Sequence, residues 1–303
     1  MLGGVARWDA RWVFLASIAV FGLAHGACDP FVPGWVLGRR MSGRFVAFFC
    51  LAYLGLAGLV FLLWRWQPTL ALLGFLLLTA WHWGSADAAL TGSSGWKFVM
   101  LAWGRGIMVL SAPAAFHPQR TFQVLASLAP SFPVLLPPSR LQSAAAVLLV
   151  ASVATPLSCW LVSTNRRQAA SHQLETLFLV GLFAACDPLL ATALYFIWLH
   201  SWRHILRLCR WQSPGSGSLF LRLGRFHLVA LPCVLGALGL LCLVAWRWPD
   251  DLLRAYLILL SAVTLPHALL VGWLDRAETS QPLPACELRL RTTTAVQWLH
   301  LAP

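Results

Sequence analysis

Charged residues are scarce in this sequence, making up 11% of its 303 residues, whereas soluble globular chains carry roughly 25%. The shortage is greatest for acidic residues, with 10 Asp and Glu against 22 Lys and Arg. No Gly-rich phosphate loop, HExxH motif or GxSxG motif occurs, so the common signals for phosphate binding, zinc proteolysis and serine hydrolysis are missing. The eight cysteines show no CxxC spacing, and we infer no disulfide framework. No long basic run occurs either, so the net charge of +12 does not indicate nucleic acid as a partner.

Hydrophobic residues make up 59% of the chain, and 17 Trp and 17 Phe are among them. A transmembrane helix needs about 20 mostly apolar residues. The sequence therefore predicts an all-α, polytopic integral membrane bundle with a single domain over 1–275 and a tail over 276–303. The expected spans, nine in number, are 12–31, 44–64, 69–90, 97–116, 142–162, 169–186, 188–207, 226–247 and 252–273.

Proline placement shapes two further expectations. Five prolines fall within 117–141, which predicts an extended loop on the membrane surface. Pro188 lies inside an apolar stretch over 169–207 that is roughly twice the hydrocarbon thickness as a helix. We expect two spans that meet at Pro188, and one long kinked helix is the alternative.

The distribution of Lys and Arg predicts the orientation of the chain. With nine spans and the N-terminus outside, the inner segments hold about twice as many basic residues as the outer ones. Arg7 and Arg11, before the first span, favour the opposite arrangement. The balance predicts an external N-terminus and a cytoplasmic C-terminus, with basic residues close to membrane lipid head groups.

Four histidines lie at similar depths of four spans that run in the same direction. His25, His82, His200 and His267 follow the starts of their spans by 12 to 15 residues, which places them in a slab about 5 Å thick. His204 lies one turn after His200 on the same helix face. Imidazole is a common ligand of iron, copper, zinc and nickel, and intramembrane polar groups are costly enough to indicate function. We predict that at least four of these five bind a metal, and separate hydrogen bonds to neighbouring helices are the alternative.

Polar residues next to these histidines are candidates to orient them. Asp29 follows His25 by four residues, Asp87 follows His82 by five, and Arg203 precedes His204. A metal-bound imidazole usually donates its second N–H to a carboxylate or a carbonyl. Each aspartate could instead cap a helix end or pair with a loop arginine.

Aromatic residues surround the same positions and suit an apolar polyene or sterol that arrives from the bilayer. The candidates for a substrate pocket are Trp81, Trp83, Tyr195, Phe196, Trp198, Trp202 and Trp273. An interfacial aromatic belt is the alternative for several of them. The other histidines, His117, His172, His227 and His300, lie near span ends or in the tail, where we expect surface or interfacial roles.

Five motifs resemble those of a known family. They are GLAHGACD at 22–29, WHWGSAD at 81–87, FHP at 116–118, LYFIWLHSWRH at 194–204 and TLPHALLVGW at 264–273. In this order they resemble the Brp/Blh family of bacterial and archaeal β-carotene 15,15′-dioxygenases over about 20–275. One departure is Pro30, where histidine is expected after the aspartate.

The resemblance implies an Fe(2+)-dependent enzyme of the cytoplasmic membrane. Such an enzyme cleaves β-carotene centrally with O2 and yields two molecules of all-trans-retinal, which can supply a microbial rhodopsin. The motifs imply His25, His82, His200 and His204 as catalytic iron ligands. His267 is implied as a fifth ligand or as part of the pocket wall.

Three other classes of protein stay open on the residues alone. A haem-carrying electron-transfer protein is one, although His200 and His204 on one helix face cannot bind opposite sides of a haem. A non-catalytic carotenoid-binding protein is the second. A diiron hydroxylase or desaturase is the third, and it usually has more HxxxH and HxxHH clusters than the single HxxxH found here.

Overall fold

The structure is a computed structural model, and it describes residues 22–91, 93–132, 136–161, 166–212, 218–247 and 251–280. Within these ranges every regular element is a helix and no strand occurs, which confirms the predicted all-α class. The chain divides into two compact units. The first contains 1–41 and 186–259, and the second contains 42–185 and 260–303. The expectation of a single domain stays a prediction.

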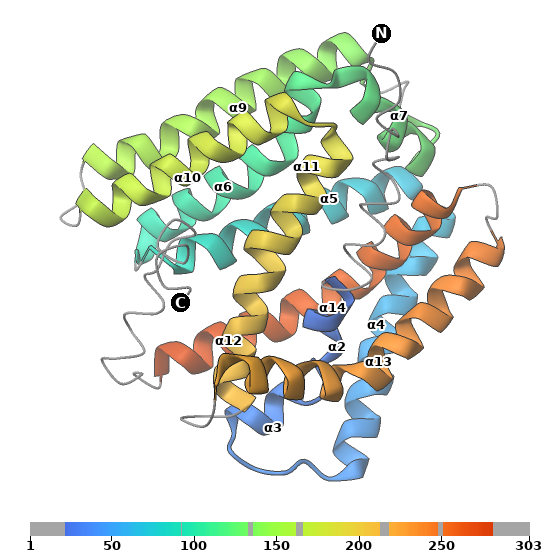
Figure 1. Cartoon of the computed structure of the whole chain (residues 1–303). Coiled ribbons are helices and arrows are strands. Elements are labelled where there is room, and N and C mark those ends of the chain that lie inside the picture. The colour runs from blue at the N-terminus through green and yellow to red at the C-terminus, as the bar shows by residue number, and fades with distance from the viewer. Residues whose placement is uncertain are drawn as a thin grey trace, which may run out of the picture. The chain divides into compact units, whose positions relative to one another are not determined.

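The second unit is built around helix α6. Its helices are α4 (Gly43–Trp66), α5 (Pro68–Ala89), α6 (Gly95–Phe116), α7 (Pro118–Leu128), α9 (Pro138–Leu161), α10 (Arg166–Ala185) and the later part of α14 (Leu252–Ser280). Helix α6 packs against α5 and α9, and α10 packs against both α6 and α9 (Figure 1). Ala102, Met108 and Ala112 of α6 are fully buried, so this helix forms the centre of the unit.

Helices α5 and α6 approach each other at two glycines. A Cβ atom on Gly84 would lie 1.8 Å from the carbonyl oxygen of Ala102, and one on Gly106 would lie 1.8 Å from that of Ala80. Only glycine permits such a contact, because any other residue would place a side chain inside the neighbouring backbone. Small residues at helix contacts are typical of membrane helices, and Gly84 and Gly106 allow this close approach.

Helix α4 presents most of its surface outward. Phe48, Leu51 and Leu59 are 71%, 71% and 63% exposed, which suits a helix face in contact with lipid tails. Two polar contacts tie its other face to α14, because the Tyr53 hydroxyl donates to the carbonyl of Val263 at 3.2 Å and the Trp64 indole N–H donates to the Ser261 hydroxyl. Aromatic N–H and O–H groups usually find such partners when they are buried.

The first unit joins short helices to one long helix. Its described helices are α2 (Leu23–Ala27), α3 (Val32–Val36), α11 (Pro188–Tyr195), the π-helix η2 (Phe196–Ser201), α12 (Trp202–Gln212), α13 (Leu219–Arg247) and the first part of α14. Helix α2 packs against α13, and α12 packs against both α3 and α13. Besides this packing, the Cys28 thiol donates to the carbonyl of Phe226 at 3.8 Å.

The predicted break at Pro188 is confirmed. Helix α10 ends at Ala185, and α11 begins at Pro188 after a bend at Cys186. Proline suits a first helical position because its missing N–H needs no partner there. The Asp187 carboxylate caps the new helix by accepting the N–H of Leu189 at 2.9 Å.

Six described helices are long and apolar enough to cross a membrane, namely α4, α5, α6, α9, α13 and α14. The count of nine spans is therefore not confirmed. The first half of the first expected span, 12–31, lies outside the described residues. The spans expected at 169–186 and 188–207 are helical, but polar residues such as Glu175 and Arg203 lower their hydropathy.

The expectation of an extended loop over 117–141 is wrong in its first half. Pro118–Leu128 forms helix α7, and Pro138 begins α9. Both prolines occupy the start of a helix, where a missing N–H and a fixed φ favour helix rather than oppose it. Counting prolines without regard to their position in a helix produced the error.

Candidate metal site

Three of the predicted ligands lie together in the first unit. The His25 ring centroid is 5.5 Å from that of His200 and 5.6 Å from that of His204, and both pairs meet edge to face. His25 comes from α2, His200 from η2 and His204 from α12. All three are buried, with exposed fractions of 6%, 3% and 7%. The HxxxH spacing therefore places both of its imidazoles against the same third histidine.

The residue spacing around His200 is set by the π-helix. In η2 the backbone bonds run from i to i+5, which widens the turn, and such segments occur frequently at functional sites. His200 lies within η2, and α12 resumes the α-helical spacing at Trp202, so His204 follows in ordinary α-helix. The sequence analysis assumed one uniform α-helix here. No composition signal identified the wider turn.

Phe196 is the aromatic neighbour of this histidine cluster. Its ring stacks on that of His200 with a centroid distance of 5.5 Å and meets His25 edge to face, also at 5.5 Å. Phe196 is 4% exposed and Tyr195 beside it is fully buried. These contacts restrict the rings of two candidate ligands and provide an apolar wall next to them.

The second unit holds the other two predicted ligands. The rings of His82 on α5 and His267 on α14 meet edge to face with centroids 5.0 Å apart. Both are buried, at 4% and 4% exposed. A single histidine can be explained by a hydrogen bond to a neighbouring helix. Two buried imidazoles in contact favour the interpretation that both serve as metal ligands. The prediction that at least four of the five histidines bind a metal stays a prediction.

The spacing of the rings within each cluster fits ligands of a common metal. With a metal–nitrogen distance of about 2.1 Å, the metal stands roughly 3.2 Å from the ring centroid. Two imidazoles at about 100° to 120° around it then have centroids roughly 4.9 to 5.5 Å apart. The observed separations of 5.0 and 5.5 Å fall within this range, and the third, 5.6 Å, lies just above it.

The histidine side chains, in the rotamers that the structure gives them, do not all point their nitrogens at one common position. Among the described residues, no group of three or more His, Cys, Asp or Glu side chains is arranged to hold a metal ion. The second side-chain torsion of histidine is soft and takes a broad range of values. Ring rotation at the observed spacing can therefore turn the nitrogens toward one ion without moving the helices.

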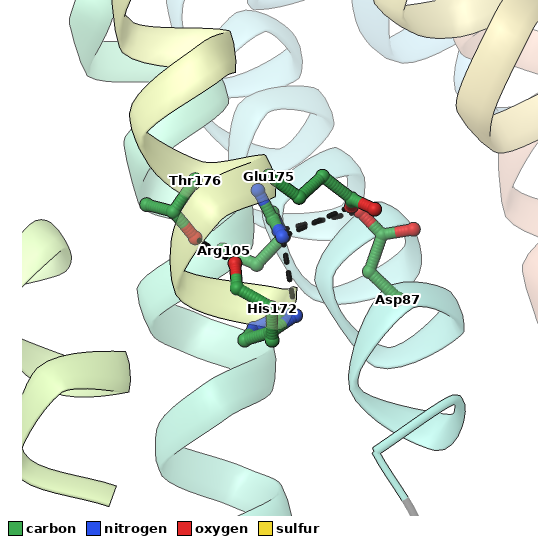
Figure 2. Close-up of polar contacts among 5 residues, drawn as sticks. All are labelled: Asp87, Arg105, His172, Glu175 and Thr176. Atoms are coloured by element: carbon green, nitrogen blue, oxygen red, sulfur yellow. Dashed lines mark hydrogen bonds and ion pairs between the residues drawn. The ribbon is translucent and has the colours of Figure 1, made fainter. Parts of the chain in front are cut away.

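A buried ionic cluster lies near one end of α5, and its central residue was missed by the sequence analysis. The Arg105 guanidinium contacts Asp87 through Nε at 3.4 Å and Glu175 through Nη2 at 3.1 Å. Nη2 also lies 3.2 Å from Nδ1 of His172, and the Thr176 hydroxyl donates to the His172 carbonyl at 2.9 Å (Figure 2). Asp87 therefore pairs with an arginine inside a helix, whereas the sequence suggested a loop arginine as the partner.

The expectation for His172 is wrong. It was assigned a surface or interfacial role, yet it is 8% exposed and contacts Arg105. Because α10 begins at Arg166, His172 lies almost two turns inside the helix rather than at its end. Its neighbours Glu175 and Thr176 are also buried. The signal that could have revealed this face was the spacing of His172, Glu175 and Thr176, which is the i, i+3, i+4 spacing of one helix face.

The remaining candidates occupy varied environments. Asp29 is 1% exposed in the turn after α2, and Arg203 is half-buried on α12. Among the candidates for the pocket, Trp83 is buried and Trp202 is half-buried. Trp198 and Trp273 are 68% and 36% exposed, which places them on outer surfaces of their helices.

Trp81, another candidate for the pocket, packs against aromatic residues of α6. Its ring packs against Phe98 and Trp103 of α6, with centroids 6.2 and 5.5 Å away. This side chain therefore contributes to the contact between α5 and α6. The adjacent residue, His82, points to a different side of α5 and meets α14.

Comparison with known proteins shows the family. The model of the family described as Beta-carotene 15,15'-dioxygenase matches residues 16–275, and the chain belongs to this family. It is 27% identical to the "Probable beta-carotene 15,15'-dioxygenase Blh" of Halobacterium salinarum, over 87% of this chain and 84% of that protein. It is also 25% identical to the "Beta-carotene 15,15'-dioxygenase" of an uncultured marine bacterium, over 89% and 96% of the two chains. No solved structure matches the chain.

Proposed function

We propose that this protein cleaves β-carotene at its central double bond with O2 and releases two molecules of all-trans-retinal. Family membership over 16–275 and two relatives bearing the name of this activity support the reaction. The observation in the structure that carries the proposal is the contact of His25 with both His200 and His204 inside an apolar unit. A buried trio of imidazoles suits a metal better than it suits structural packing alone.

We assign His25, His82, His200 and His204 as ligands of Fe(2+), and His267 as a further candidate. Ferrous iron, when bound, supplies the redox chemistry by which O2 reacts with an otherwise inert polyene. Imidazole ligands would leave the full positive charge of the ion in place, because they carry no negative charge of their own. No carboxylate ligand is needed for this assignment.

The chain's own residues bind the polyene and keep water away. Phe196 and Tyr195 are almost fully buried beside the His25 cluster, so they provide apolar surface next to the reacting site. A hydrocarbon such as β-carotene has no polar group for recognition, and therefore shape and aromatic contact must set its position. The outward-facing helix surfaces are consistent with entry from the bilayer.

We place the protein in the cytoplasmic membrane with its N-terminus outside and its C-terminus in the cytoplasm. The excess of basic residues in the inner segments supports this orientation. Retinal is itself soluble in lipid, so a retinal-binding microbial rhodopsin in the same membrane is the partner we propose for the product.

Expression in a β-carotene-producing bacterium tests this function. The cells should lose their orange colour and accumulate retinal, and the purified protein should contain iron. Unchanged β-carotene in cells that contain folded, iron-loaded protein would reject the proposal. Apocarotenals of other lengths as sole products would keep oxidative cleavage and reject the central position. A Soret band would instead identify a haem protein, and copurified pigment without turnover would identify a binding protein.

A further inference from the structure

Arg105 is an unusual residue for the middle of a membrane helix. It is 3% exposed, and it lies at the midpoint of α6 beside Gly106. Its ion pairs and hydrogen bonds lead to Asp87 on α5 and to His172 and Glu175 on α10 (Figure 2). Charged residues at such positions are costly and are usually kept for a function.

The contacts to α5 all reach one side of that helix. At 100° per residue, Ala80, Gly84 and Asp87 fall on one face, and each of them meets α6. His82 lies roughly 160° from Gly84 and about 140° from Asp87 around the same helix. Its ring meets His267 of α14. Helix α6 therefore packs against one face of α5, and the candidate ligand His82 lies on the other side of the helix.

We propose that Arg105 is a positioning residue that sets the rotation of α5 and so the place of the His82 imidazole. This inference rests on the proposed role of His82 as an iron ligand. The contact at Gly84 and Gly106 fixes how closely α5 and α6 approach. It does not prevent α5 from rotating about its own axis, because glycine has no side chain that interlocks with the neighbouring helix. The ion pair between Arg105 and Asp87 removes that freedom by joining the helices through side chains of defined geometry.

A small rotation is enough to matter. An imidazole nitrogen stands roughly 6.5 Å from the helix axis, so a turn of about 10° moves it by about 1.1 Å. Functional sites must be held within roughly 0.5 Å of their productive geometry. A loosened α5 would thus remove His82 from the metal without unfolding the bundle.

Arginine is better suited to this role than lysine. Its planar guanidinium presents several N–H donors in fixed directions, and here Nε meets Asp87 while Nη2 meets the two residues on α10. A lysine ammonium is a compact point charge that cannot reach the same three partners at once. Arg105→Lys therefore keeps the positive charge but loses the simultaneous contact with α5 and α10.

The test compares Arg105→Lys with Thr176→Val in purified protein. The control loses a buried hydrogen bond one turn from His172 but leaves every contact of Arg105 in place. We expect Arg105→Lys to bind Fe(2+) roughly 10- to 100-fold more weakly, the usual effect of losing a residue that orients a ligand. The EPR spectrum of its ferrous nitric oxide adduct should change, and Thr176→Val should match the wild type in both measurements.

Asp87→Asn provides a second variant in case the lysine protein does not fold. It keeps the shape of the side chain and should weaken iron binding to a similar degree. The double variant should bind Fe(2+) no more weakly than the weaker-binding single variant, because both changes remove the same ion pair. Wild-type Fe(2+) affinity and an unchanged spectrum in either folded single variant would overturn the inference. A double variant whose loss of affinity equals the product of the two single losses would overturn it as well.

A measurement without iron separates this inference from the proposed function. Cysteines at positions 82 and 267 should form a disulfide rapidly under oxidation, and adding Arg105→Lys should slow that reaction. If the wild-type protein binds no iron, the proposed function fails and the crosslink alone decides whether Arg105 positions this residue. Equal crosslinking rates in the two backgrounds would overturn the inference.

Discussion

Gly84→Ala should separate α5 from α6 and lower the stability of the second unit. The added Cβ would lie 1.8 Å from the carbonyl oxygen of Ala102, whereas such contacts essentially never fall below 3.0 Å. The helices must therefore part by about 1.2 Å at this crossing. A gap of roughly 0.5–1 Å already forfeits a quarter to a half of a dispersion contact. Overpacking usually costs about 1–3 kcal/mol, and we expect the upper end because the opposing atoms are backbone.

The assay is thermal unfolding in detergent, followed by loss of the monodisperse peak in size-exclusion chromatography. One kcal/mol corresponds to about 2 °C for a chain of this size, so we expect the midpoint to fall by roughly 6 °C. Iron content per folded protein should fall as well, because His82 follows the movement of α5.

Gly74→Ala is the matched control on the same helix. A Cβ at Gly74 meets nothing within 4 Å, and replacing a helical glycine by alanine at an unstrained position stabilises by about 0.4–1 kcal/mol. Its midpoint should therefore rise slightly. If Gly84→Ala proved as stable as Gly74→Ala, the close crossing would be wrong, and the support that α6 provides to His82 would be wrong with it.

Three further predictions follow from the site and the topology. His200→Ala and His204→Ala should each lose bound iron and retinal formation while staying inserted in the membrane, whereas His227→Ala should keep both; full iron in His204→Ala would reject the ligand set. A cysteine at Ser218 should resist a membrane-impermeant thiol reagent on intact cells, and ready labelling would reverse the orientation. Asp187→Ala should destabilise the start of α11 by about 1 kcal/mol through loss of its N-cap, measured as a lower unfolding midpoint, and an unchanged midpoint would show that the cap is dispensable.

Hydropathy and local motifs predicted much of this fold. Runs of apolar residues identify α4, α5 and α6 because a membrane helix must satisfy its backbone internally and expose apolar side chains. Pro188 was placed correctly because a missing N–H has a local effect. The contact of His25 with His200 and His204 could be expected because helical spacing alone puts the last two on one face.

The features that sequence could not supply depend on partners far away in the chain. Arg105 has no acidic residue within one helical turn in the sequence, and only packing reveals that α10 brings Glu175 to it, 70 residues away. The same polar residues lower the hydropathy of α10, which is not among the six described helices apolar enough to cross a membrane. The width of η2 also left no mark in residue composition, because α- and π-helices accept the same side chains.

The π-helix Phe196–Ser201 gives this region a tolerance to a change of chain length that the ordinary helix after it lacks. A π-turn accommodates about one residue more than an α-turn. Deleting a single residue within it would let the segment relax to ordinary helix, and α12 would keep its orientation because the lost residue is the one that the wide turn takes up. Deleting a residue between Ser201 and His204 has no such compensation and would turn His204 by about 100° relative to His200. A deletion at the start of α12 should therefore abolish function as completely as loss of a histidine, whereas a deletion within the π-helix should be the milder change.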